Sequence, residues 1–496
     1  MTSLTDDALT GLDPQVARPE YDRTTLSVGI VHIGVGGFHR AHQAMYLDEL
    51  MRTGRAHDWA ICGLGLMPGD VRMRDALKAQ DGLYTLVVKH ADGSTQARVI
   101  GSILDYVYAP EDPEVALARM TDPAVRIVSL TVTEGGYNVN QVTGEFDLTN
   151  PAVRADLEPG AVPRTSFGYV IEALRRRREA GTPPFTVMSC DNIQGNGHNA
   201  QRMFGAFARA KDPDLAAWID AQVPFPNSMV DRITPVTTDA DRALVAERFG
   251  LEDAWPVVTE PFTQWALEDH FADGRPPYEE VGVQVVDDVT PYELMKLRLL
   301  NVSHQGIAYL GYLAGYRLVH EVAQDPMFAT FLRAYMDHEG SPTLQPVPGV
   351  DLEEYKATLI ERFSNAAVRD TVARLCAESS DRIPNWLVPV IRENVAAGGE
   401  VTRSALIVAS WARYAEGVDE QGEPIEIVDR IADRVHAAAL AQAEDDLAFL
   451  RDRDLFGDLV EDERFVAAYR WALSSLHERG SRATIQALLD GEAPGA

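Results

Sequence analysis

Three polar side chains that could handle a proton and a hydroxyl group fall close together in one segment, as Lys296, Asn301 and His304. The pattern of residues 292–313 predicts a helix, and at about 100° per residue His304 falls about 80° and Asn301 about 140° from Lys296. A lysine with a lowered pKa could take the proton of an alcohol while an asparagine holds the developing alkoxide. Spacing alone also fits a salt-bridged surface lysine and a satisfied core histidine, and by itself favours that structural interpretation.

A second polar cluster, residues 189–197, follows an apolar run at 185–188 that we expect to form a buried strand. The carboxyl ends of strands are where an open α/β sheet presents its ligand-binding groups. Asn192 is the candidate hydrogen-bond donor of this cluster. An ordinary turn rich in asparagine and glycine fits the same residues equally well.

A glycine pair follows the first predicted strand, residues 28–33, and precedes a predicted helix, residues 41–52. Gly34 and Gly36 match the first two positions of the dinucleotide-binding fingerprint, in which backbone approaches a pyrophosphate at a helix N-terminus. His39 occupies the third position in place of glycine, so the match is imperfect. The position between a strand and a helix nevertheless favours nucleotide binding.

Residues 63–69 contain further glycines after a second predicted strand, residues 59–62. Pro68 and the lack of a helical pattern directly after it indicate a connecting loop. Asp70 lies where a Rossmann domain keeps the acid that binds the ribose hydroxyls, and such an acid favours NAD over NADP. A helix N-cap aspartate explains Asp70 as well.

Composition excludes several classes of function. The chain has 496 residues, with 45 basic and 75 acidic side chains and a net charge of −30, which disfavours binding to nucleic acid or to an anionic membrane. Three well-separated cysteines indicate neither a disulfide framework nor a structural zinc site. The pair His39 and His42 has no further ligand at metal-binding spacing. We find no secretory signal and no transmembrane stretch, so we expect a cytoplasmic protein.

The order of the predicted elements indicates two domains. Strands alternate with helices up to about residue 290, which is typical of a parallel α/β sheet. Helical patterns dominate afterwards, at 292–313, 326–336, 352–363, 404–416 and 425–449. We therefore predict an α/β fold with a Rossmann-type NAD-binding domain at 1–288 and a mostly α-helical substrate and catalytic domain at 289–496.

These segments together resemble the long-chain polyol-specific dehydrogenases, the mannitol 2-dehydrogenase family. The resemblance covers nearly the whole chain. Its landmarks are the segments 33–42, 133–137, 189–192 and 225–235, and the helix that carries Lys296, Asn301 and His304. Membership would imply reversible, NAD-dependent oxidation of a polyol at C2, such as D-mannitol to D-fructose, without zinc.

The resemblance implies a role for each residue that matches a family position. The general acid/base falls on Lys296, and the asparagines that bind the oxyanion fall on Asn192 and Asn301. The histidine that binds a substrate hydroxyl falls on His304. Glu293 matches a residue implicated in proton movement between the site and solvent.

Further matches concern the substrate and the cofactor. Asp231, Arg374 and Arg382 fall at additional substrate-pocket positions. The cofactor-binding residues implied are Ile33, Gly34, Gly36, Gly37, Phe38 and Asp70.

Two departures leave the substrate and cofactor preferences open. Arg382 stands where mannitol enzymes of the family carry lysine, which can change the hydroxyl preferences of the pocket. Gly69 precedes Asp70 where a second acid can occur, which weakens discrimination against NADP. The alternatives are a hexuronate reductase of the same family, acting on fructuronate or tagaturonate, and a non-catalytic NAD-binding protein. We expect a monomer that binds a small polyol or ketose.

Overall fold

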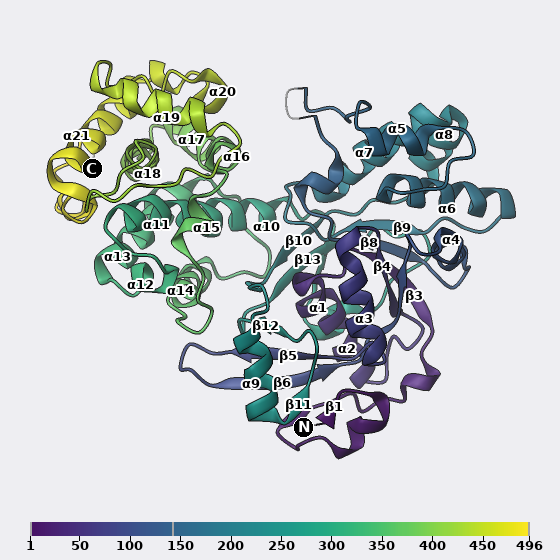
Figure 1. Cartoon of the computed structure of the whole chain (residues 1–496). Helices are drawn as coiled ribbons and strands as arrows, with labels where there is room; N and C mark the ends of the chain where they lie inside the picture. Colours follow the sequence, from purple (N-terminus) through teal and green to yellow (C-terminus); the bar gives the residue numbers. More distant parts are fainter. Residues whose placement is uncertain (1, 141–142, 495–496) are drawn as a thin grey trace. The chain divides into compact units, whose positions relative to one another are not determined.

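The computed structural model describes residues 2–140 and 143–494 of the chain (Figure 1). The chain divides into two compact units. Unit 1 comprises Met1–His90 and Ser94–Thr290, and unit 2 comprises Ala91–Gly93 and Pro291–Ala496.

The centre of unit 1 is a five-stranded sheet in which every pair of neighbouring strands is parallel. Across the sheet the strands are β7 (Ile103–Tyr108), β4 (Ala60–Gly65), β3 (Val28–Ile33), β8 (Ile127–Leu130) and β9 (Thr186–Ser189). Numbered along the chain, this order is 3-2-1-4-5, which is that of a Rossmann sheet, and it reverses between β3 and β8. The predicted parallel sheet and its first strand at 28–33 are therefore confirmed.

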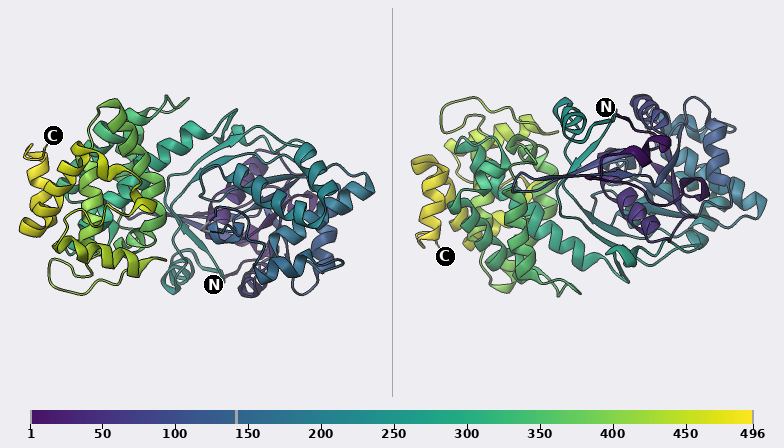
Figure 2. Two further views of the ribbon diagram at one scale, coloured as in Figure 1. Left: turned by 90° about the horizontal axis from the view of Figure 1, so that it is seen from above. Right: turned by 90° about the horizontal axis from the view of Figure 1, so that it is seen from below.

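Helices cover both faces of this sheet, so β3 is buried along its whole length. Val31 and Ile33 belong to one hydrophobic cluster, which includes side chains of α4, α6 and α7, whereas Ile30 belongs to another, which includes side chains of α2 and α3. The helices of unit 1, seen from two further sides in Figure 2, are α1 (Gly37–Ala41), α2 (Gln43–Arg52), α3 (Val71–Ala79), α4 (Pro113–Thr121), α5 (Pro151–Leu157), α6 (Ser166–Ala180), α7 (Asn196–Lys211), α8 (Pro213–Gln222) and α9 (Asp239–Phe249).

Smaller sheets extend unit 1 beyond the Rossmann core. One has the order β12-β5-β6-β2, another β10-β13-β14, and β1 pairs with β11. Their bounds are β1 (Thr2–Ser3), β2 (Val16–Ala17), β5 (Tyr84–Lys89), β6 (Thr95–Ile100), β10 (Ser228–Asp231), β11 (Leu251–Glu252), β12 (Val257–Thr259), β13 (Gln264–Glu268) and β14 (Gln284–Val286).

Unit 2 is built from helices, as predicted. Its helices are α10 (Thr290–Met295), α11 (Val302–Leu313), α12 (Val319–Ala323), α13 (Pro326–Tyr335), α14 (Leu352–Phe363), α15 (Val372–Cys376), α16 (Ser379–Trp386), α17 (Val388–Ala397), α18 (Thr402–Tyr414), α19 (Ala432–Leu440), α20 (Arg453–Phe456) and α21 (Glu463–Leu489). α10 and α11 are joined by the π-helical segment η6 (Lys296–Asn301), so the predicted helix at 292–313 is continuous.

The prediction of a helix at 425–449 is wrong over much of this range. Only α19 is α-helical there, and it begins at Ala432. The preceding residues form long-range hydrogen bonds instead of helical ones: the Val428 carbonyl accepts from the Glu378 backbone N–H, and the Asp429 carboxylate accepts from Ser380. These contacts with the start of α16 override the local helical pattern.

Candidate active site

The turn from β3 to α1 has glycine where the backbone requires it. Gly34 has a φ of +93°, and a Cβ there would lie 2.2 Å from the Thr131 carbonyl oxygen. The Thr131 hydroxyl donates to the Gly34 carbonyl at 2.7 Å, which ties the turn to the end of β8. Gly36 is the N-cap of α1, and a Cβ there would meet only the Gly34 carbonyl oxygen, at 3.8 Å. The turn therefore leaves its backbone open to close approach by a pyrophosphate.

The remaining predicted cofactor residues continue this turn. Ile33 is the last residue of β3 and is buried, while Gly37 and Phe38 open α1. The Phe38 ring stacks on His42 with ring centroids 4.9 Å apart. The predicted helix at 41–52 is interrupted at His42, whose φ of −124° and ψ of −93° separate α1 from α2.

His39, at the third fingerprint position, is buried against β3. It is 1% exposed, and its ring stacks on His32 of β3 with centroids 3.5 Å apart. Burial and the neighbouring His32 and Arg40 hold the pKa of His39 well below its ordinary value. Burial also lowers the pKa of His32 to about 3. Both rings are therefore neutral at physiological pH, which allows them to stack in the core.

Asp70 ends a short 3₁₀ turn, η3 (Pro68–Asp70), after β4. One carboxylate oxygen, Oδ2, accepts from the backbone N–H groups of Leu66 at 2.9 Å and Met67 at 2.8 Å. Asp70 occupies the N-cap position of α3, as one interpretation predicted, but its side chain closes the preceding turn and forms no capping hydrogen bond with α3. α3 begins directly after it, at Val71, contrary to the expectation of a plain connecting loop.

Asn192 lies just beyond β9 and is exposed. Its neighbour Asp191 is buried and accepts hydrogen bonds from the backbone N–H groups of Val132 and Thr133 and from the Tyr137 hydroxyl, the last at 2.7 Å. Burial raises the pKa of the Asp191 carboxyl, although these hydrogen bonds oppose the shift. Asp191 therefore fastens the loop after β8 to the end of β9, beside Asn192.

The loop after β8 is strained at Thr133, which has a φ of +62°. A β-branched residue rarely adopts this conformation, and such strain persists only where its surroundings enforce it. Sequence reasoning identified 133–137 and 189–192 as landmarks but assigned no role to Asp191 or Tyr137. The available signal is that each motif directly follows a strand of the parallel sheet, β8 or β9, and the carboxyl ends of parallel strands lie at one edge.

Asp231 is the last residue of β10 and is 5% exposed. It pairs with Gln264 in the antiparallel ladder between β10 and β13. The next residue, Arg232, donates to the carbonyls of Ala41 and Glu260, which links this strand end to α1. Asp231 therefore lies at the end of a paired strand, and the residue after it is hydrogen-bonded to α1, the helix that follows the glycine turn.

The helix that carries Lys296 contains a wide turn. The Val302 N–H donates to the carbonyls of Leu297 and Leu299, and the first of these lies five residues back rather than four. A π-turn of this kind takes up one extra residue. Asn301 then falls about 40° and His304 about 20° from Lys296, in place of about 140° and 80° in a regular helix. The wide turn brings the three polar residues onto one side of the helix more closely than the sequence predicts.

These helix residues are mostly buried within unit 2. Glu293 and Lys296 are each 7% exposed, Asn301 is 5% exposed, and His304 is half-buried with its ring 4.5 Å from that of Phe363. The Asn301 side-chain nitrogen is buried and has no hydrogen-bond partner among the described residues. A buried amide that lacks a partner costs about 1–3 kcal/mol, so its position calls for an acceptor from outside the chain.

The two predicted arginines meet at α15. Arg374 forms an ion pair with Asp370, with Nε 2.6 Å from Oδ1. Arg382, on α16, donates to the carbonyls of Leu375 at 3.0 Å and of Arg374 at 3.3 Å, and its guanidinium lies 5.6 Å from the centre of the Trp386 ring. Arg382 therefore anchors the short helix that presents Arg374.

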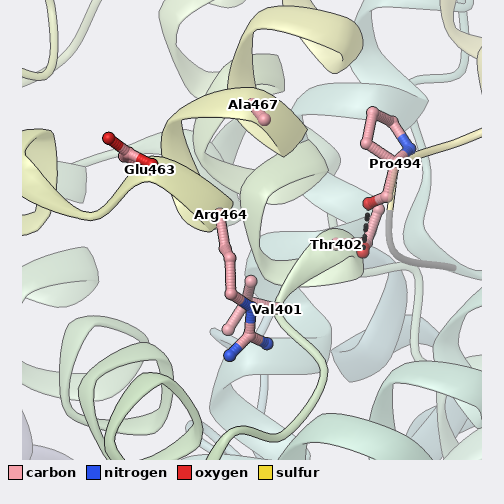
Figure 3. A pocket seen from close by; sticks show the side chains of 6 residues that line it. All are labelled: Val401, Thr402, Glu463, Arg464, Ala467 and Pro494. Atoms are coloured by element: carbon pink, nitrogen blue, oxygen red, sulfur yellow. Dashed lines mark hydrogen bonds between the residues drawn. The ribbon is translucent and has the colours of Figure 1, made fainter.

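Unit 2 also has a cavity of about 260 Å³ near the start of α18, where α21 begins. Its lining residues are Val401, Thr402, Glu463, Arg464, Ala467 and Pro494. Figure 3 shows the Arg464 side chain extending beside Val401, and the Thr402 hydroxyl donates to the Pro494 carbonyl at 3.4 Å. None of the predicted site residues lines this cavity.

Among the described residues, no group of three or more histidine, cysteine, aspartate or glutamate side chains is placed to hold a metal ion. None of the helices there combines the length and apolar character that crossing a bilayer requires.

Comparison with known proteins places this arrangement in a family. Residues 28–280 match the Mannitol dehydrogenase Rossmann domain, and residues 288–477 match the Mannitol dehydrogenase C-terminal domain. The chain belongs to the mannitol dehydrogenase family. Its relatives include the mannitol 2-dehydrogenase of Phaeosphaeria nodorum, 49% identical over 95% of this chain and 83% of the relative. Another is the mannitol 2-dehydrogenase of Aspergillus fumigatus, 48% identical over 94% of each chain.

Solved structures of the mannitol dehydrogenase family match nearly the whole chain. Mannitol 2-dehydrogenase of Pseudomonas fluorescens, solved as a ternary complex with NAD and D-mannitol, is 46% identical, covers 99% of this chain and 100% of its own, and has a TM-score of 0.88. A D-sorbitol dehydrogenase in substrate-free form is 40% identical, covers 97% and 100%, and has a TM-score of 0.91. The predicted fold class, a Rossmann domain followed by a largely helical domain, is confirmed.

Proposed function

We propose that this chain is an NAD-dependent polyol 2-dehydrogenase that interconverts D-mannitol and D-fructose. The observation that carries the proposal is the wide turn of the α10–α11 helix, which sets Lys296 and the unpartnered amide of Asn301 on one side. A proton acceptor beside a preorganised donor is what the oxidation of an alcohol requires. The choice of substrate is supported by the ternary complex of the relative from Pseudomonas fluorescens.

The residues of unit 1 fit NAD. Gly34 and Gly36 leave the backbone of the β3–α1 turn open to a pyrophosphate. Asp70 uses only Oδ2 to close its own turn, which leaves Oδ1 to accept from ribose hydroxyls. Its negative charge would repel a 2′-phosphate. We therefore propose NAD rather than NADP as the cofactor.

The proposed chemistry separates the proton from the hydride. NAD⁺ held at the β3–α1 turn would supply the acceptor for the hydride that leaves C2 of the polyol. Lys296 takes the proton of the C2 hydroxyl and returns it when a ketose is reduced. Asn301 and Asn192 donate hydrogen bonds to the oxygen as it becomes an alkoxide. His304 binds an adjacent hydroxyl.

Glu293 and the substrate-pocket residues complete the proposal. Glu293 lies on α10 three residues before Lys296, about one helical turn away, and we assign it to proton movement between Lys296 and solvent. Asp231, Arg374 and Arg382 are assigned to the binding of substrate hydroxyl groups. No step in this scheme uses a metal ion.

The hexuronate alternative needs a cation for the substrate carboxylate. The charge of Arg374 is balanced by Asp370, and Arg382 donates to backbone carbonyls through Nη1 alone, so their remaining N–H groups suit a neutral hydroxyl better than a carboxylate. We therefore favour a neutral polyol. The non-catalytic alternative gives no reason for the buried amide of Asn301.

We infer that the domains are 1–288 and 289–496. The division between units after Thr290 and the family matches, which end at 280 and begin at 288, support this boundary. A monomeric state and a cytoplasmic location stay predictions.

The test is NADH formation by the purified protein with NAD⁺ and, in parallel, mannitol, sorbitol, arabinitol or mannonate. Turnover on mannitol with none on mannonate is expected. Turnover on mannonate alone would overturn the polyol assignment in favour of the hexuronate reductase. Higher kcat/KM for sorbitol than for mannitol would keep the chemistry but replace the substrate.

A further inference from the structure

The wide turn of the α10–α11 helix leaves one backbone carbonyl without its usual helical partner. In a regular α-helix the Val302 N–H would donate to the Arg298 carbonyl, four residues back. It donates to the carbonyls of Leu297 and Leu299 instead. Arg298 is 6% exposed, so its carbonyl needs another donor.

Tyr335 supplies that donor. This residue ends α13 and is fully buried, and its hydroxyl donates to the Arg298 carbonyl at 3.0 Å. Burial holds the pKa of Tyr335 well above its ordinary value, so the hydroxyl keeps its proton. The hydrogen bond suits the wide turn specifically, because in a regular helix this carbonyl would already accept from the Val302 N–H.

A second wide turn, η7 (Met336–Gly340), directly follows Tyr335 and packs against the first. A Cβ on Gly340 would lie 2.8 Å from Leu299 Cδ2 and 3.4 Å from the Arg298 carbonyl oxygen, so only glycine fits without displacement. The buried carboxylate of Glu339 accepts from the backbone N–H groups of Arg403 at 2.7 Å and Ser404 at 2.8 Å. These bonds fix the second turn to the start of α18.

The Arg298 side chain is held as firmly as its backbone. Its guanidinium forms two hydrogen bonds with the Glu393 carboxylate, at 2.6 and 2.7 Å, and a third with the Thr343 carbonyl at 2.6 Å. Arg298, in the wide turn, is therefore bonded at two places: its backbone carbonyl accepts from the Tyr335 hydroxyl, and its side chain pairs with Glu393.

We propose that Tyr335 is a positioning residue for the reaction: by holding the Arg298 carbonyl it keeps the wide turn in place, and with it the alignment of Lys296 and Asn301. The inference rests on the proposed function for its effect on catalysis. Without this hydrogen bond the Arg298 carbonyl regains a buried donor most directly from its usual helical partner, the Val302 N–H, which requires the regular helical pattern. That change would turn Asn301 by about 100° relative to Lys296.

The test compares Tyr335→Phe with Tyr469→Phe. Tyr469 is also fully buried in unit 2, and its hydroxyl donates to Gln442 on an element remote from the wide turn. We expect Tyr335→Phe to lower kcat for mannitol oxidation at least about tenfold with KM for NAD⁺ unchanged, because small misplacements of reacting groups are costly. Tyr469→Phe should keep the wild-type kcat. Thermal melting should show comparable losses of stability in both variants.

Backbone amide exchange over residues 296–304 gives a readout that needs no substrate. It should quicken in Tyr335→Phe and keep the wild-type rate in Tyr469→Phe. Gly340→Ala, which displaces Leu299, should reproduce both effects of Tyr335→Phe. Wild-type kcat in Tyr335→Phe, or unchanged exchange, would overturn the inference. If the wild-type protein shows no turnover but amide exchange is still faster in Tyr335→Phe than in wild type, the proposed function is refuted and the structural role of Tyr335 is kept.

Discussion

At the scale of single residues, two members of the candidate site, the buried Asn301 and the half-buried Asp70, have hydrogen-bonding capacity to spare. The Asn301 amide nitrogen has no partner among the described residues, and Asp70 commits one of its two carboxylate oxygens to backbone N–H groups. Unsatisfied polar groups in a core reduce stability and are retained where they bind something. This spare capacity is consistent with the ligands that we propose, an alkoxide for Asn301 and a ribose for Asp70.

Lys296→Met should lower kcat about 10³-fold or more, because removing a general base typically costs a factor of 10²–10⁴. NADH binding should persist, since the glycine turn and Asp70 belong to unit 1. Stopped-flow turnover and NADH fluorescence titration measure the two effects. Lys78→Met replaces an exposed lysine and should behave as wild type. Substantial turnover in Lys296→Met would refute the role of Lys296.

Asp70→Asn should reduce the preference for NAD over NADP about tenfold, because it removes the charge that repels a 2′-phosphate. Asparagine keeps an oxygen that can accept from the Leu66 and Met67 N–H groups, so the turn should survive. The ratio of kcat/KM for the two cofactors is the measurement. Asp75→Asn, on the neighbouring α3, should leave that ratio unchanged. The same ratio in Asp70→Asn and wild type would mean that Asp70 serves the turn alone.

At the scale of elements, the site lies where regular structure is interrupted. The helix after β3 stops after five residues, at the His42 break. The catalytic helix contains the π-helical segment η6, and π-bulges are frequent at functional sites. The loop after β8 contains the strained Thr133, held by Asp191. Long-range contacts accompany two of these interruptions, the Tyr335 hydroxyl at the wide turn and the Asp191 carboxylate at Thr133.

Gly34→Ala should weaken NADH binding at least about tenfold, because a residue with a side chain is strained at a φ of +93°. The added Cβ would also lie 2.2 Å from the Thr131 carbonyl oxygen. Fluorescence titration with NADH checks this. Gly11→Ala, where an added Cβ meets nothing within 4 Å, is the matched control and should bind NADH normally. Normal affinity in Gly34→Ala would place the pyrophosphate elsewhere.

At the scale of the whole molecule, two units with separate cores divide the proposed work. Unit 1 carries the cofactor turn, Asp70 and Asn192, and unit 2 carries Lys296 and Asn301. In unit 1 the neutral ring of His32, on β3 of the central sheet, stacks on the neutral ring of His39, on α1. The fold of this unit thus depends on two histidines staying uncharged, which makes its stability sensitive to acid.

The stability of unit 1 should fall as the pH drops below about 6.5. Because burial lowers the pKa of His32 from 6.5 to about 3 in the folded state, the unfolded state binds a proton first. Between pH 7 and pH 4.5 this single group should cost about 3 kcal/mol. Urea unfolding at the two pH values measures the loss.

His32→Gln should show a smaller loss between the two pH values, since glutamine does not titrate and can still reach Ser129, which His32 contacts at 2.8 Å. His270→Gln, which replaces an exposed histidine, should lose as much stability as wild type. An equal loss in His32→Gln and wild type would assign the acid sensitivity to other groups.

Local sequence patterns determined much of the fold and of the candidate site. The largely apolar run of β3, the glycines after it and the apolar face around Lys296 are recognisable because burial and backbone freedom act over a few residues. The Rossmann domain, the helical domain and the family follow from these segments. The polar residues of the catalytic helix were likewise visible as costly exceptions in an apolar pattern.

Only the tertiary structure decided how these residues are aligned. The wide turn that brings Asn301 towards Lys296 depends on Tyr335, more than thirty residues along the chain. The support of the loop beside Asn192 depends on a carboxylate, Asp191, from a neighbouring strand. Residues 425–431 lost their predicted helix to contacts with α16. A periodic pattern indicates which face of an element is buried. The residues that widen or end the element by hydrogen bonding to it come from distant segments of the chain, and no local pattern predicts those contacts.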